Sequence, residues 1–353
     1  RGTVLDQRHP ASPTPRFNPF ILVPALGVAF GVLAFAGSAL RLAMTETLIV
    51  SVLSLSLVLM AGFVGQVTLA ELTFAGIAAF ALARLADVNG IPFPWSPLLA
   101  IAITTVVAAF LSFPAVRIRG LQLAIVTYSG AIAMEQVLFH NPKLSGVGGF
   151  VTVPAPVILG APFGPGSGPK RTPGAFPYKP FGFFVLGVAV LCGLLVANVR
   201  RAAVGRRMLA VRANERAAAA CGVHVPRTKL LGATVGCFVA SCAGVLWAYK
   251  YIQFNSETFP ASDALDFIAL AYIGGIAMVS GAYIAGMFAS AGFFFAIWSG
   301  GSGPPRWQLL ASGIGMVIVA VKFPGGLASA GPAVRHWWAA RRTDRRTDRR
   351  TAV

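Results

Sequence analysis

Ten long apolar segments, separated by short polar connections, constrain the fold of this chain more than any other feature of its sequence. A helix needs about 20 predominantly apolar residues to cross the hydrocarbon core of a bilayer. A membrane-spanning β-barrel would instead show short segments of alternating hydrophobicity. The apolar segments cover residues 19–40, 45–62, 68–86, 96–114, 121–139, 180–199, 228–250, 262–279, 281–299 and 307–321.

The composition agrees with this interpretation. Only 11% of the residues are charged, whereas soluble domains carry roughly 25%. The sequence therefore predicts an all-α polytopic membrane protein with about ten transmembrane or re-entrant helices. Segments 68–86 and 262–299 are rich in glycine and alanine, so we expect tilted, broken or re-entrant helices there.

The basic residues are unevenly distributed along the chain. The net charge is +18, and of the 29 lysines and arginines eight lie in 200–229 and another eight follow residue 321. An excess of basic residues marks the cytoplasmic connections of a membrane protein. The sequence has no soluble domain that could bind nucleic acid, so the charge does not indicate a nucleic-acid-binding protein. It predicts instead that both termini and the loop 200–229 are cytoplasmic.

These patterns predict how the chain is organised. Residues 1–18 form a flexible cytoplasmic arm, and residues 19–322 form the transmembrane domain. Within that domain, 140–179 is a glycine- and proline-rich external loop. The basic cytoplasmic tail, 323–353, is attracted to anionic membrane lipid.

Groups that carry enzyme chemistry are scarce in this sequence. The four histidines lie in loops or tails without a neighbouring acidic cluster, and the four cysteines fit neither zinc spacing nor a disulfide framework. An enzyme needs a nucleophile, a base or a metal. We therefore expect no catalytic residue, no metal site and no cofactor in this chain.

The clearest carboxyl side chains within the apolar segments are those of Glu71, Glu135 and Asp266. An ionisable group in a membrane is costly unless it is paired or hydrated, so it is a candidate for function. Each of these groups can face a transport pathway, cap a broken helix or form a hydrogen bond between helices. The sequence leaves these alternatives open.

Two glycine-rich stretches accompany these carboxyls. In "GFVGQVTLAELTFAGIAAF" (62–80), Gly65 and Gln66 stand at the cytoplasmic edge of an apolar segment, and Thr68 can cap the next helix. "AYIGGIAMVSGAYIAG" (271–286) contains Gly274 and Gly275 where two short segments meet. Glycine lets a backbone approach another helix or a solute closely. The pathway candidates among these residues are Gly65, Gln66, Thr68, Glu71, Asp266, Gly274 and Gly275; Thr127, outside the two stretches, is a further candidate.

The stretch "VGRRMLAVRANERAAAACGVHVPRTKLL" (204–231) places five arginines, a lysine and a glutamate between two apolar segments. Its apolar positions form no clean stripe, so it does not resemble a helix lying on a membrane surface. We expect a short cytoplasmic helix that presents Arg212, Glu215 and Arg216 to a soluble partner. The alternative is a basic anchor that only sets topology.

These pieces together resemble the permease subunits of branched-chain amino-acid ABC importers, in particular the longer member of the permease pair. The resemblance covers about residues 45–327. It is carried by the stretches already quoted and by "RIRGLQLAIVT" (117–127), "LSGVGGF" (144–150), "DFIALAYIGGIAMVSGAYIAG" (266–286) and "FPGGL" (323–327).

The most specific match is the loop 200–229, which the resemblance identifies as the coupling helix seated in a groove of a cytoplasmic ATPase subunit. The positions that carry this expectation are Gly205, Arg206, Arg212, Glu215, Arg216, Ala218, Gly222 and Lys229. The chain departs from the family after Gln66. Thr68 and the pair Ala70-Glu71 stand where the family usually has serine and then glycine–histidine or glycine–glutamine.

The resemblance implies an ABC importer permease fold and transport by alternating access. The expected partners are two cytoplasmic ATP-binding subunits that use ATP and Mg, a second permease subunit, an extracytoplasmic solute-binding protein and a small polar solute. The expected location is the inner membrane of a bacterium. The chain itself would hold no nucleotide.

Two alternatives remain at the level of sequence. Related permeases carry urea or short amides, so the solute is not limited to branched-chain amino acids. An ion-coupled secondary transporter acting alone would use Glu71, Glu135 and Asp266 as ion sites, and it would give the basic loop no role beyond topology.

Overall fold

The computed structural model describes residues 19–116, 118, 120–141, 150–158, 161–164, 179–298, 313–314, 317 and 326–328. The predicted arm 1–18, most of the loop 140–179, nearly all of the segment 307–321 and nearly all of the tail 323–353 lie outside the described residues.

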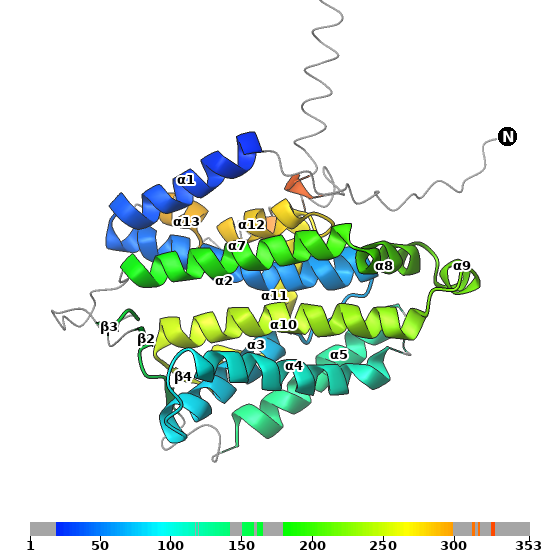
Figure 1. Ribbon diagram of the computed structural model, residues 1–353, viewed down its shortest axis with the longest axis horizontal. Helices are drawn as coiled ribbons and strands as arrows, with labels where there is room; N and C mark the ends of the chain where they lie inside the picture. Colours follow the sequence, from blue (N-terminus) through cyan, green and yellow to red (C-terminus); the bar gives the residue numbers. More distant parts are fainter. Residues whose placement is uncertain are drawn as a thin grey trace, which may run out of the picture.

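Three helices make up the centre of the bundle (Figure 1). They are α2 (Ser38–Leu57), which continues in π-helical winding as η1 (Val58–Val64), α3 (Glu71–Ala83) and α10 (Val225–Tyr251). Every residue of α2 from Ala43 to Leu57 is buried. Because α2 is covered on all sides it has no exposed polar face, and its polar side chains, such as Thr45, Glu46 and Ser51, are buried together with the apolar ones.

The helices α2 and α10 run antiparallel. Near the start of α10, Gly232 packs on Val64, and one turn later Gly236 packs on Met60. At the end of α10, Lys250 contacts Glu46. Residues later in α10 therefore contact residues earlier in α2 and η1, as expected for two antiparallel helices packed along their full lengths.

Glycine allows α3 to pack closely on α10. A side chain at Gly244 would overlap the backbone of Ala75, so the two helix backbones meet directly at this position. The small residues predicted to give close helix contacts serve that purpose here.

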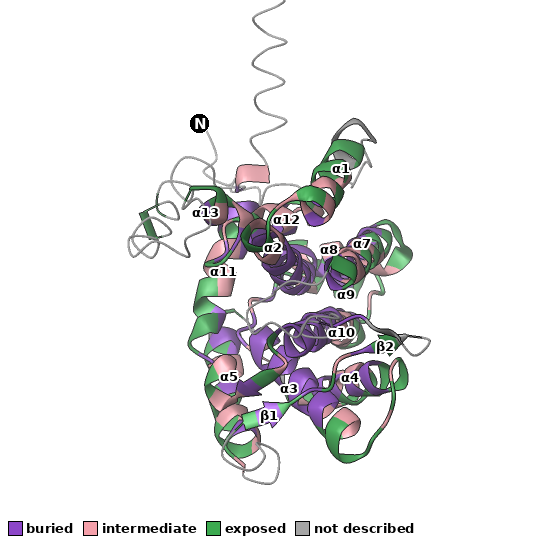
Figure 2. Ribbon diagram, turned by 90° about the vertical axis from the view of Figure 1, so that its left-hand side faces the viewer, coloured by how far each residue is buried: buried purple, intermediate pink, exposed green. Residues whose placement is uncertain are grey.

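The outer helices cover this centre and expose apolar side chains. They are α1 (Pro19–Phe35), η2 (Arg84–Val88), α4 (Trp95–Ala115), α5 (Leu121–Met134) with η3 (Glu135–Phe139), and α7 (Lys179–Arg201). Only 28% of the most apolar part of α4 is buried, against 94% for α2 with η1. Figure 2 shows the same division between a buried centre and an exposed periphery. Exposed apolar helix surface of this kind suits a lipid environment.

A broken helix follows α10. The two halves, α11 (Asp263–Gly274) and α12 (Val279–Met287), meet at an angle of 118°. Gly275 supplies the break with a φ of 116°, which only glycine adopts readily. A short helix, α13 (Phe293–Trp298), comes next. The glycine pattern of 262–299 therefore predicted the position of an interruption.

Small elements close the two ends of the bundle (Figure 1). At one end lie α8 (Ala203–Ala213) and α9 (Glu215–Ala220). At the other end β1 (Phe150–Thr152) pairs antiparallel with β4 (Gln253–Asn255), ahead of the 3₁₀ turn η5 (Ser256–Thr258). A second hairpin joins β2 (Val157–Ile158) to β3 (Ala161–Pro162). These two pairs of strands are absent from the all-helical prediction.

The number of spans is smaller than predicted among the described residues. Four helices are long and apolar enough to cross a membrane, and the bent pair α11–α12 raises the count to five. The other described segments give helices that are too short or do not meet this criterion. The predicted count of about ten is therefore not confirmed, although the predominantly helical fold is.

Candidate functional site

The helices α8 and α9 meet at Asn214, and we call the two helices together the α8–α9 corner. This residue ends α8 and caps α9, and its side-chain oxygen accepts hydrogen bonds from the backbone N–H groups of Arg216 (3.0 Å) and Ala217 (3.2 Å). Asparagine is among the best N-cap residues for this reason. Gly222, with a φ of 80°, ends α9.

An ion pair fixes α9 to the bundle. The Lys229 ammonium of α10 lies 2.7 Å from a carboxylate oxygen of Glu215, and the two side chains are 2% and 25% exposed. Ala218, one turn after Glu215, is also buried. The inner face of α9 is therefore anchored by charge and by packing.

Arg212 fixes α8 to the end of η1. Its guanidinium donates a hydrogen bond to the backbone carbonyl of Gly62, and its side-chain stem packs against Gly65. Burial lowers the pKa of Arg212 below its ordinary value, as expected when a charged group loses water. The side chain thus points into the bundle, where it joins the corner to the core helix α2.

The remaining residues of the predicted coupling loop divide into two groups. Gly205 is packed so tightly against the backbone of Val199 and Arg200 that a side chain would overlap it. Arg206, Arg216 and Gly222 are exposed. Of the three side chains predicted to face a partner, only Arg216 is exposed in this structure, whereas Arg212 and Glu215 hold the corner in place.

A second candidate region begins where η1 ends. Gly65 has a φ of 79°, and residues 66–70 run without helical winding to the start of α3. The Thr68 hydroxyl donates to a carboxylate oxygen of Glu71 (3.0 Å). The backbone N–H of Leu69 donates to the Thr127 hydroxyl of α5 (3.2 Å). The structure therefore brings three predicted pathway residues, Thr68, Glu71 and Thr127, to one place.

A small cavity opens beside this unwound segment. We call it the Glu71 cavity; its volume is about 10 Å³, room for about one water molecule. Glu71 is 3% exposed and stands at the first position of α3, where the helix dipole favours a negative charge. The lining residues are Leu53, Leu57, Thr68, Leu69, Glu71, Leu72, Ala264 and Phe267.

Other predicted pathway residues lie elsewhere. Gln66 is buried, but it does not line the Glu71 cavity. Asp266 is exposed on α11, while Gly274 and Gly275 are buried at the break before α12. Glu135 accepts a hydrogen bond from the backbone N–H of Ala261 (2.8 Å) just ahead of α11. This hydrogen bond joins the end of α5 to the segment that precedes α11.

The end of η1 connects the two regions. Gly62 faces the backbone of Ile276, in the break between α11 and α12, so closely that a side chain would overlap it. Because Gly62 and Gly65 also contact Arg212, the same short turn touches the α8–α9 corner and the broken helix.

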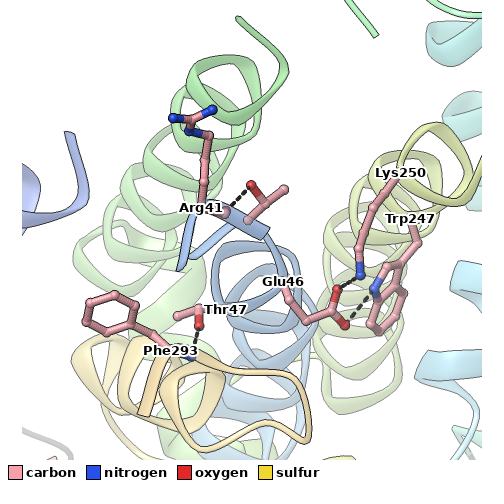
Figure 3. Close-up of polar contacts among 7 residues, drawn as sticks. Arg41, Glu46, Thr47, Trp247, Lys250 and Phe293 are labelled. Atoms are coloured by element: carbon pink, nitrogen blue, oxygen red, sulfur yellow. Dashed lines mark hydrogen bonds and ion pairs between the residues drawn. The ribbon is translucent and has the colours of Figure 1, made fainter. Parts of the chain in front are cut away.

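One buried charged cluster was missed by the sequence reasoning. Figure 3 shows Lys250 of α10 paired with Glu46 of α2, while the Trp247 ring N–H donates to the other oxygen of that carboxylate (3.1 Å). Glu46 is 7% exposed and Lys250 is 8% exposed. The sequence could have identified both residues, because each charged side chain falls within or at the edge of an apolar segment. Both belong to the same class as the three carboxyls that were selected.

Metal ligands do not gather in this region or elsewhere in the described part of the chain. No group of three His, Cys, Asp or Glu side chains there is placed to hold an ion.

Comparison with known proteins decides the family. Residues 39–320 match the family described as "Branched-chain amino acid transport system / permease component". The chain belongs to this family. The predicted resemblance to this family is thereby confirmed.

Curated relatives agree with this assignment. The chain is 29% identical over 248 residues to the high-affinity branched-chain amino acid transport system permease protein LivM of Salmonella typhimurium and to that of Escherichia coli. The match covers 66% of this chain and 57% of each LivM protein, so the chain spans little over half the length of these relatives. It is also 34% identical over 103 residues to the autoinducer 2 import system permease protein LsrC of Klebsiella pneumoniae, covering 29% of each chain. No solved structure matches the chain.

Proposed function

We propose that this chain is the transmembrane permease subunit of an ATP-driven importer for branched-chain amino acids in a bacterial inner membrane. Its family and the names of its LivM relatives support this proposal. The basic α8–α9 end of the bundle faces the cytoplasm, as do both termini, and the β1–β4 end faces outward. A second permease subunit completes the pathway, and the full domain contains about ten transmembrane or re-entrant helices.

In this proposal, α8 and α9 form the coupling element. Two cytoplasmic ATP-binding subunits bind ATP and Mg, close, and displace the corner, with exposed Arg216 and Arg206 as contacts. The observation that carries the proposal is the position of Arg212, because its bond to Gly62 links the corner to the core helix α2. The pair Glu215–Lys229 makes α9 move with α10.

The solute enters from an extracytoplasmic solute-binding protein that docks on the external loop 140–179. It then passes the region of Gln66, Thr68, Glu71 and Thr127. Alternating access follows if displacement of the corner changes the packing of η1 against the break at Gly275.

The experiment that tests this proposal is reconstitution of the importer in liposomes. This chain is purified with its two ATP-binding subunits and second permease, and uptake of L-leucine is measured with the binding protein outside and ATP inside. We expect uptake that vanadate abolishes. Arg212→Met and the double variant Glu215→Ala/Arg216→Ala should lose both uptake and the stimulation of ATP hydrolysis by the binding protein. Arg212→Met should still purify with the ATP-binding subunits.

A second candidate function is supported by one observation. Glu71 is a buried carboxyl of the kind that an ion-coupled carrier requires. The placement of the other two carboxyls weakens this alternative, because Asp266 is exposed and Glu135 bonds a backbone N–H. Uptake that continues without ATP hydrolysis and follows an ion gradient would favour this alternative and contradict the importer. Urea and acetamide, tested in the same liposomes, address the alternative solutes.

A further inference from the structure

We propose that the Glu71 cavity is the subsite that binds the ammonium group of a small aliphatic solute during its passage through the membrane. The inference rests on the proposed transport function and adds to it a named chemical contact. Glu71 provides the negative charge, Thr68 orients the carboxylate, and the surrounding leucine and phenylalanine side chains receive the aliphatic part.

The hydrogen bonding of Glu71 leaves room for a cation. One carboxylate oxygen accepts the bond from Thr68, and the Ser56 hydroxyl lies close to the same carboxyl group. The second oxygen, Oε2, is buried and has no hydrogen-bond partner among the described residues. No lysine or arginine in the described part of the chain forms an ion pair with Glu71. A buried carboxylate without a countercharge is costly, and an ammonium group would supply the missing partner.

The contrast with other buried acids supports this assignment. Glu46 has Lys250 and Trp247 as partners, and Glu215 has Lys229. Glu71 is the least exposed of the three, at 3%, yet it lacks a basic partner. Glu46 and Glu215 are thus each paired with a lysine, whereas the carboxyl beside the cavity has no basic partner among the described residues.

The shape and chemistry of the lining match an aliphatic cation. Apart from Thr68 and Glu71, the cavity is lined by four leucines with Ala264 and Phe267. An apolar wall with a single charged group at one side is typical of a site that recognises a small amphiphilic molecule. A solute with an ammonium group and a branched carbon chain satisfies both parts.

The cavity must open before it can hold such a solute, since its present volume is that of about one water molecule. The wall able to move is α11, which contributes Ala264 and Phe267 and ends at the glycine break before α12. Its opposite side is exposed, with Leu265 at 53%. The other wall begins at Gly65, which packs on Arg212 of the coupling corner. The segment that borders the subsite therefore contacts α8, the helix that ATP binding by the partner subunits would displace.

Variants of Glu71 test the inference in the reconstituted importer. L-leucine uptake is measured with saturating binding protein, so that the affinity of that protein does not limit the rate. We expect Glu71→Gln to lower the maximal rate of uptake by at least about tenfold, the effect of one charge-assisted hydrogen bond. Stimulation of ATP hydrolysis by the binding protein should persist, and Glu71→Asp should restore part of the uptake.

The matched control is Thr73→Val. It removes from the same helix a buried hydroxyl that, like Glu71 Oε2, has no hydrogen-bond partner among the described residues, and Thr73 does not line the cavity. Its uptake should equal that of the unmodified importer. Unchanged uptake in Glu71→Gln, or equal losses in Glu71→Gln and Thr73→Val, would overturn the subsite. Absence of ATP-driven leucine uptake in the unmodified importer would instead count against the proposed function itself.

A second measurement needs no variant and decides the matter if Glu71→Gln does not assemble. Two fragments of leucine are added at equal millimolar concentration to the unmodified importer during uptake. Isopentylamine keeps the ammonium group and the branched chain, and 4-methylpentanoate keeps the chain without the ammonium group. We expect inhibition by the amine alone. Equal inhibition by both fragments, or by neither, would overturn the proposal.

Discussion

Replacing Glu215 with alanine should loosen the α8–α9 corner, because it leaves the Lys229 ammonium without its partner. The Lys229 side chain is 2% exposed and that of Glu215 is 25% exposed, with 2.7 Å between the charged atoms. Removing one partner of a fully buried pair costs about 3–5 kcal/mol, whereas exposed pairs contribute about 0–1 kcal/mol. With one partner buried and the other partly exposed, we expect a cost of about 2–4 kcal/mol.

Replacing Lys229 instead of Glu215 should destabilise the α8–α9 corner much less. Lys229→Met removes the charge from the buried position and fills the same space with an apolar side chain, while the Glu215 side chain stays 25% exposed. The cost should be at most about 1 kcal/mol. The double variant Glu215→Ala/Lys229→Met should then recover most of the stability that Glu215→Ala loses.

Amide hydrogen exchange of residues 215–223 measures this effect where it occurs. A loss of about 2 kcal/mol in local stability corresponds to roughly 30-fold faster exchange. We expect this acceleration in Glu215→Ala and little change in Lys229→Met. Equal effects of the two single variants, or a negligible effect of Glu215→Ala, would refute the reasoning. Such a result would mean that the lysine side chain reaches water on its own.

The other predictions concern packing, capping and the second ion pair. Gly244→Ala should destabilise the purified protein by about 1–3 kcal/mol, because its methyl group overlaps the backbone of α3; Gly187→Ala, with open space around it, should leave the unfolding temperature unchanged. Asn214→Ala should cost about 0.5–2 kcal/mol in the stability of α9, visible as faster amide exchange there but not in α10. Lys250→Met should lower the unfolding temperature more than Lys250→Met combined with Glu46→Gln, because only the single variant leaves a buried carboxylate without its lysine.

Hydropathy predicted the long helices well, since a continuous apolar segment bounded by polar residues has only one helical solution in a membrane. Segment 96–114 corresponds to α4 (Trp95–Ala115), and 228–250 corresponds to α10 (Val225–Tyr251). The boundary between the first two helices was wrong. The structure begins α2 at Ser38, inside the predicted segment 19–40, because the residues on both sides of the break at Gly37 are apolar.

The site residues show where reasoning from sequence ends. Gly65 has the positive φ that glycine permits, but the role expected of Thr68 was wrong. Helix α3 begins at Glu71 without a side-chain cap, and the Thr68 hydroxyl donates to the Glu71 carboxylate instead. The direction in which the Arg212 side chain points could not be predicted. An arginine in a basic loop is expected to face water or a partner, and the acceptor of its hydrogen bond lies 150 positions away in the sequence. Glu46 and Lys250 are likewise 204 residues apart, so only the packing of two helices reveals that each neutralises the other.

The contacts at the end of η1 explain why a glycine-rich turn suits the transmission of movement. Gly62 lies directly against the backbone at Ile276, and Gly65 lies against the Arg212 side chain, whose guanidinium also donates to the Gly62 carbonyl. Flexible side chains absorb small displacements by changing rotamers, but backbone atoms in direct contact have no such freedom. On the α8 side of the turn the Arg212 side chain is held both at its stem, by Gly65, and at its guanidinium, by the Gly62 carbonyl, so we expect a displacement of α8 to shift η1. Because η1 also contacts the break between α11 and α12, that shift reaches the wall of the Glu71 cavity. Contact alone does not demonstrate coupling; the test is whether Arg212→Met, while still purifying with the ATP-binding subunits, loses both uptake and the stimulation of ATP hydrolysis by the binding protein.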